Sequence, residues 1–127
     1  IAPLIHCVRW KIILIMLSLF GSVLKKIPRR FKKVSSDIKF VAKIRADHLE
    51  PKQIDVSWPK AMVQWEKTLV EFKTPILHTL VLQGDLDNTV DGPYNLKWLE
   101  SKFFNLRKIE IKGGRHHLHN ESPELLL

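Results

Sequence analysis

Two short polar segments hold most of the side chains that could carry out acid–base chemistry. Residues 84–91 read GDLDNTVD, and residues 113–121 read GGRHHLHNE. The first segment contains Asp87 and the second contains His116. A carboxylate beside an imidazole forms a general base with its orienting acid, because the carboxylate fixes the tautomer and stabilises the imidazolium ion. The two segments therefore predict a catalytic pair, if the fold brings Asp87 and His116 together.

Each polar segment follows a stretch that predicts a β-strand. The run ILHTLVLQG, at residues 76–84 after Pro75, is aliphatic and β-branched and predicts a buried parallel strand. The run KIEI, at residues 108–111, predicts a second short strand, and residues 94–104 between them have the apolar spacing of a helix. A strand–helix–strand unit of this kind places the chain in the α/β class. Because adjacent parallel strands end at the same sheet edge, the two polar segments should be neighbours.

The remaining segments predict one further strand and several helices. The apolar run IAPLI at residues 1–5 predicts a buried strand, and residues 10–33 look helical until Pro28. Ser35, Ser36 and Asp37 offer an N-cap for a following helix. Residues 56–70 carry a helical apolar stripe, with Pro59 suited to the first turn.

The basic run at residues 25–33 favours a solvated face or a loop that covers an apolar surface, and contact with an anionic membrane surface is the alternative. The 127 residues have a net charge of +8, and 45% are hydrophobic. The apolar run Ile12 to Leu24 is shorter than the roughly 20 residues that span a bilayer. No small-residue cleavage site follows it, so no signal peptide is indicated and the expected location is cytoplasmic or peripheral to a membrane. A basic run follows, and such runs occur on proteins that contact anionic lipid. Its basic residues are Lys25, Lys26, Arg29, Arg30, Lys32 and Lys33.

Several classes of site are disfavoured by composition. A single cysteine, Cys7, excludes an internal disulfide framework and a multi-cysteine metal site. The basic run has no accompanying base-stacking pattern, so no nucleic acid is expected as a partner.

Three other interpretations of the polar segments remain open. The string DLDNTV matches the DxDxT signature of aspartyl-phosphate phosphatases, in which Asp85 would be the nucleophile, although no acidic pair for magnesium follows. A metal site could use His116, His117 and His119 with Asp87. A purely structural role would have Asp85 or Asp87 cap the next helix. We expect neither a metal nor a cofactor.

Residues 74–124 resemble the C-terminal part of α/β-hydrolases. The similar subgroup contains bacterial monoacylglycerol lipases, lysophospholipases and serine aminopeptidase-like proteins, which place the triad aspartate in a strand–GxxD loop and the histidine in a later HxLxxE segment. The resemblance identifies Asp87 and His116 as two triad members, with Leu118 and Glu121 in the matching positions. It implies hydrolysis of carboxylic esters of lipids by a Ser-His-Asp mechanism.

The same resemblance implies a division of the chain. Residues 1–9 would be the core strand after the nucleophile region, 10–70 a helical cap, and 71–127 the last part of the α/β core. The implied fold is a partial α/β-hydrolase with its last three parallel strands and a cap insertion. The cap segment Ile12 to Leu24 would shape a pocket for the acyl chain. His117 and His119 would support the catalytic pair, and Asp85 and Asp91 would organise their loop.

The sequence departs from the family at the nucleophile. The family places its serine in a GxSxG turn, and no GxSxG occurs in these residues. The serines that lack flanking glycines are Ser18, Ser22, Ser35, Ser36, Ser57, Ser101 and Ser122. We therefore expect this chain alone to be inactive in acyl transfer, marginally stable and prone to aggregate. The alternative is a non-catalytic truncated remnant or a membrane-surface binding module.

Overall fold

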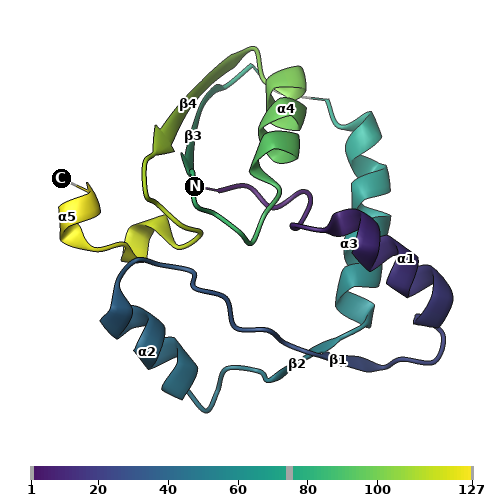
Figure 1. The fold of residues 1–127 in the computed structure, drawn as a ribbon. Coiled ribbons are helices and arrows are strands. Elements are labelled where there is room, and N and C mark those ends of the chain that lie inside the picture. The colour runs from purple at the N-terminus through teal and green to yellow at the C-terminus, as the bar shows by residue number, and fades with distance from the viewer. Residues whose placement is uncertain (1, 74–75, 127) are drawn as a thin grey trace.

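The computed structural model describes residues 2–73 and 76–126, which form a mixed α/β structure with two small sheets (Figure 1). Its helices are α1 (Trp10–Phe20), α2 (Ile38–Ala46), α3 (Ser57–Thr68), α4 (Gly92–Lys102) and α5 (Pro123–Leu126). Its strands are β1 (Lys26–Pro28), β2 (Gln53–Asp55), β3 (His78–Gly84) and β4 (Asn105–Ile111). Short 3₁₀ turns cover Leu69–Glu71 and Leu118–Asn120.

The strand–helix–strand unit predicted from the sequence is confirmed. β3 pairs in parallel with β4, in a register that runs from His78 opposite Asn105 to Gly84 opposite Ile111. In Figure 1, α4 lies along this pair and connects the two strands. β4 begins three residues before the predicted KIEI, while Pro75, which was expected to precede β3, lies outside the described residues.

β3 is less buried than its composition predicted. Val81 and Gln83 are almost fully covered, at 4% and 5% exposure, whereas Leu80 is 53% exposed. Successive side chains of a strand point to opposite faces, so one face of β3 is covered and the other is open along its first half. The prediction of a buried strand is therefore wrong for this half.

The predicted strand at residues 1–5 is not formed. Ile1 lies outside the described residues, and residues 2–6 are irregular. Asn95, which is fully buried, accepts a hydrogen bond from the His6 backbone N–H at 2.7 Å. Its Nδ2 donates to the Pro3 carbonyl at 2.9 Å and to the His6 carbonyl at 3.1 Å. Because one side chain satisfies these backbone groups, the segment needs no neighbouring strand, and the described residues contain two parallel strands, not three.

The helix expected across residues 10–33 is shorter than predicted. α1 ends after eleven residues, where the Gly21 N–H bonds to the Leu17 carbonyl. β1 then pairs antiparallel with β2, an element that the sequence did not reveal. Three-residue strands are too short to show an alternating pattern, and β1 contains Pro28.

The other two predicted helices are confirmed. Asp37 caps α2, since its Oδ1 accepts hydrogen bonds from the Lys39 and Phe40 N–H groups at 2.8 and 3.1 Å. Pro59 lies in the first turn of α3, as expected. α3 contacts α1 at Trp10, whose Nε1 donates to Glu66 Oε2 at 3.0 Å.

Replacing Asn95 tests the anchor of the N-terminal segment. Asn95→Ala removes the partners of the His6 N–H and the Pro3 carbonyl, which are partly buried, so we expect the free energy of unfolding to fall by about 1–3 kcal/mol. Amide exchange at His6 should accelerate. The exposed Asn105→Ala is the control and should change stability by less than about 0.5 kcal/mol. Equal effects from both variants would contradict the anchoring role.

Candidate active site

Glycines allow the two polar loops to meet at the end of the sheet. A Cβ atom at Gly84 would lie 2.3 Å from the Gly114 carbonyl oxygen, so no larger residue fits there without a shift. The Leu86 N–H donates to this same oxygen at 3.0 Å. Gly113 has a φ of 78°, which favours glycine, and its N–H donates to Asp85 Oδ1 at 2.7 Å. The loops therefore lie side by side, as the strand ends predicted.

Asp87 and His116 form a hydrogen-bonded pair. His116 Nδ1 lies 3.0 Å from Asp87 Oδ2. The Asp87 side chain is completely covered, while the His116 side chain is 24% exposed. An ionised carboxylate only accepts hydrogen bonds, so Nδ1 carries the proton and Nε2 of the neutral ring is an acceptor. The arrangement gives the imidazole the tautomer that a general base needs.

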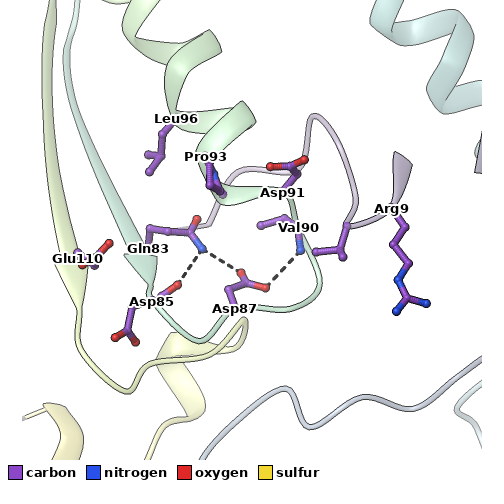
Figure 2. Close-up of a pocket in the computed structure, with 12 residues that line it drawn as sticks. Arg9, Gln83, Asp85, Asp87, Val90, Asp91, Pro93, Leu96 and Glu110 are labelled. Carbon is purple, nitrogen blue, oxygen red and sulfur yellow. Dashed lines mark hydrogen bonds between the residues drawn. The ribbon is translucent and has the colours of Figure 1, made fainter. Parts of the chain in front are cut away.

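Four donors saturate the Asp87 carboxylate. Oδ1 accepts from the Thr89 and Val90 N–H groups at 2.8 and 3.2 Å, and Oδ2 accepts from Gln83 Nε2 at 3.1 Å as well as from His116. Figure 2 shows the contacts of Asp87 with Val90 and Gln83. Burial by itself raises the pKa of Asp87, but the hydrogen bond from His116 and the backbone donors outweigh it and hold this pKa below 3.8. Asp87 is therefore ionised at neutral pH.

Gln83 is the site residue that sequence analysis missed. It belongs to the covered face of β3 and is 5% exposed. Its Nε2 also donates to the Gly84 carbonyl at 3.2 Å, which fixes the orientation of the amide because both partners are acceptors. The signal in the sequence was a polar residue directly after the apolar run at residues 80–82.

The other aspartates of the loop have structural contacts. Asp91 Oδ1 accepts from the Tyr94 N–H at 3.1 Å, so Asp91 caps α4, and not Asp85 or Asp87. Asp85 connects the two loops through Gly113. The cavity drawn in Figure 2 has a volume of about 380 Å³ and borders Asp85, Asp87 and Asp91, together with Glu110 of β4.

Glu121 fixes the histidine loop to a distant part of the chain. Its Oε1 accepts from the Arg115 N–H at 2.6 Å, and its Oε2 accepts from the Ser36 N–H at 2.5 Å and from Ser35 Oγ at 3.3 Å. The residue is only 5% exposed. The histidine loop and residues 35–36, which precede α2, are therefore held as one unit.

The neighbouring histidines pack against one another. The ring centroid of His117 lies 5.5 Å from that of His116 and 5.8 Å from that of His119. Burial and these two rings lower the pKa of His117, so its ring is neutral at physiological pH. Within residues 2–73 and 76–126, no group of three or more His, Cys, Asp or Glu side chains is placed to hold a metal ion. The metal site considered from the sequence thus has no geometric support there.

The basic run predicted to contact a membrane forms contacts within the chain, whereas the segment predicted to hold an acyl chain is largely exposed. Arg29 forms an ion pair with Glu50, and Lys32 donates to the Asn88 carbonyl, so part of the basic run faces other residues of the chain. The segment Ile12 to Leu24 contributes to a 160 Å³ apolar cavity, but many of its side chains are exposed. In the described part of the chain, no helix has both the length and the apolar character needed to span a membrane.

No protein-family model matches the chain, and no curated protein matches its sequence. Function is therefore inferred from the paired side chains and from the cavities beside them.

The Glu121 carboxylate predicts a pH-dependent stability. Burial raises its pKa, but hydrogen bonds from Ser36, Arg115 and Ser35 outweigh burial and bring the pKa below 4.5. A carboxylate whose pKa is lower in the folded state than in the unfolded state stabilises the fold at any pH above its unfolded-state pKa. This contribution is lost as the pH falls through the folded-state pKa. We expect Glu121→Gln to lower the free energy of unfolding at pH 7 by about 1–3 kcal/mol.

Urea unfolding across the acid range checks this expectation. The difference between the natural protein and Glu121→Gln should shrink as the pH falls below 4.5. The exposed Glu71→Gln serves as a control and should follow the natural protein at every pH. A difference that stays constant down to acid pH would exclude the carboxylate as its source.

Proposed function

We propose that His116 is the general base and acid of a serine hydrolase that acts on carboxylic esters of lipids, and that Asp87 is the carboxylate that orients His116. The observation that carries this proposal is the 3.0 Å contact between His116 Nδ1 and a fully covered, ionised carboxylate. The resemblance of residues 74–124 to α/β-hydrolases supports it, since it assigns the same two residues. In this proposal residues 10–70 form the cap and β3, α4 and β4 belong to the hydrolase core.

In the proposed reaction, His116 transfers one proton in each of two steps, first from the serine to the alcohol and then from water to the serine. Nε2 accepts the proton of a serine hydroxyl as that oxygen attacks the ester carbonyl, and Asp87 stabilises the resulting imidazolium. The imidazolium then protonates the departing alcohol, which leaves an acyl-serine. Water hydrolyses this ester with His116 again as the base, so the serine is restored and a carboxylic acid is released.

The nucleophile is proposed to come from a segment other than these 127 residues. Two serines that contact the histidine loop, Ser35 and Ser36, already have structural partners. Ser35 Oγ donates to the Asn120 carbonyl at 2.6 Å, and Ser36 Oγ contacts the Glu121 carboxylate at 2.5 Å. A hydroxyl held in this way is not available to a base, and no serine here has the flanking glycines of a nucleophile turn.

Asp87→Asn tests the proposed pair. The assay uses the protein together with the segment proposed to supply the serine. The asparagine favours the wrong tautomer of His116, so kcat/KM for p-nitrophenyl esters and labelling by a fluorophosphonate should fall by about 10⁴-fold. The matched control is Asp85→Asn in the same loop, which should retain activity within about tenfold. Normal turnover in Asp87→Asn, or a larger loss in Asp85→Asn, would overturn the assignment.

A second candidate function is contact with an anionic membrane surface through α1. Several apolar side chains of α1 are open to solvent, with Ile15 58% and Leu19 64% exposed. Lys25 and Lys26 follow the end of α1 by five and six positions and are exposed as well. An exposed apolar helix beside basic residues fits a lipid interface, where the apolar side chains enter the acyl boundary and the cations meet the headgroups.

Vesicle binding tests this second function. Binding to vesicles of anionic lipid should weaken steeply with added salt, because screening shortens the reach of the lysine charges. Ile15→Glu should reduce binding strongly, while Ile38→Glu, which alters an exposed apolar residue of α2, should not. Salt-independent binding, or equal losses in the two variants, would argue against this surface.

A further inference from the structure

Two side chains share one oxygen atom of the Asp87 carboxylate. His116 Nδ1 lies 3.0 Å from Oδ2. Gln83 Nε2 donates to the same atom at 3.1 Å (Figure 2). The other oxygen, Oδ1, accepts from two backbone groups, the Thr89 and Val90 N–H. The backbone therefore fixes where the carboxylate lies, while the imidazole and the amide compete for the negative charge of Oδ2.

The Gln83 amide is held in one orientation by its surroundings. Its Nε2 also donates to the Gly84 carbonyl at 3.2 Å, so each of its two N–H groups has an acceptor. The start of α4 packs against the amide, since a Cβ atom at Gly92 would lie 3.5 Å from Gln83 Cδ and 3.6 Å from Nε2. The side chain is almost fully buried, so the donor is a fixed feature of the site.

This orientation leaves the other end of the amide without a partner. Across residues 2–73 and 76–126, Gln83 Oε1 is buried and forms no hydrogen bond. Such an acceptor lowers stability, so an apolar side chain would serve the fold at least as well. Asp87 Oδ2 would keep His116, and the Gly84 carbonyl would keep the Asp87 N–H at 3.3 Å. The amide is therefore better explained by its effect on Asp87 than by stability.

The amide donor changes the charge on the atom that the imidazole contacts. A hydrogen bond to an ionised carboxylate favours the ionised form, so Gln83 makes Asp87 a weaker base. Oδ2 then attracts the Nδ1 proton of His116 less strongly, and it stabilises an imidazolium ion less strongly as well. Without the amide, both attractions would increase.

Charged groups from several other elements surround the pair. Among the residues that the structure describes, His116 alone forms an ion pair with Asp87. The ring of His117 lies 5.5 Å from that of His116, and Lys32 donates to the carbonyl of Asn88, next to Asp87. The charged residues that share the 380 Å³ cavity with Asp87 are Arg9, Asp85, Asp91 and Glu110. A variant of the amide alters none of these charges, so its effect can be assigned to the lost hydrogen bond.

We propose that Gln83 is a positioning residue that keeps the shared proton on His116 Nδ1 by donating to Asp87 Oδ2. The catalytic meaning of this contact rests on the proposed function, because a general base needs Nδ1 protonated and Nε2 free. The contact itself requires no reaction. Its effect on Asp87 is therefore measured in the 127-residue chain without a serine nucleophile.

Gln83→Met removes the donor and keeps an unbranched side chain of similar length. We expect Asp87 to bind its proton about tenfold more tightly, which raises its pKa, as followed by NMR of its carboxyl carbon. The Nδ1 proton signal of His116 should move to lower field, because its hydrogen bond to Oδ2 strengthens. The urea midpoint should stay the same or rise, since no partner is left unsatisfied. Gln64→Met, on an exposed position of α3, is the matched control and should change none of these quantities.

The pH profile of the assembled enzyme adds a readout that a structural role would not change. With the segment proposed to supply the serine, Gln83→Met should move the acid limb of the kcat/KM profile to higher pH. The reason is that a more negative Oδ2 stabilises the imidazolium ion, so Nε2 becomes free to accept a proton at a higher pH. Asp87→Asn, in contrast, should lower kcat/KM at every pH.

Three results would overturn the role of Gln83. The first is an unchanged titration of Asp87 in Gln83→Met, and the second is an unchanged Nδ1 proton signal. The third is unfolding of both Gln83→Met and Gln83→Leu, which would assign the amide to stability. Normal turnover in Asp87→Asn would remove the proposed function, whereas the titration of Asp87 would still decide whether the amide acts on the pair.

Discussion

The close approach of two backbones, at Gly84 and Gly114, is the constraint on which the candidate site depends. The parallel register of β3 and β4 ends at Gly84 opposite Ile111, and the chain turns away at once on both sides. A Cβ atom at Gly84 would lie 2.3 Å from the Gly114 carbonyl oxygen, so only glycine allows the two loops to come this close. This contact brings Asp87 and His116 within hydrogen-bond distance, because Asp87 lies three positions after Gly84 and His116 lies two positions after Gly114.

Buried polar side chains, more than a large apolar core, connect distant segments of this chain. Ser35, Gln83, Asn95 and Glu121 are buried in the described part of the chain, and each has hydrogen-bond partners. Asn95 holds the N-terminal segment on α4, and Glu121 holds the histidine loop on the segment before α2. Such contacts specify one arrangement strongly, because a wrong arrangement leaves these groups buried and unsatisfied.

Local patterns predicted the elements that local contacts determine. The helix cap at Asp37, the helix around Pro59 and the β3–α4–β4 unit could be expected because their signals lie within a few residues. The irregular segment at residues 2–6 could not, since its conformation depends on Asn95, 92 positions away from Pro3. The pairing of Asp87 with His116 was predictable from strand order, whereas the contribution of Gln83 required the orientation of its amide.

The contacts that hold the two ends of the chain together have a consequence for the order of folding. Pro3 and Asn95 are 92 positions apart, and Ser35 and Asn120 are 85 apart, whereas β3 and β4 are joined by a single helix. Closing a long loop costs entropy before any contact compensates for it. We therefore expect residues 78–111 to fold first, with the N-terminal segment docking last and limiting the rate. During synthesis, residues 2–6 leave the ribosome before Asn95 is made, so their contacts with Asn95 cannot form until α4 follows.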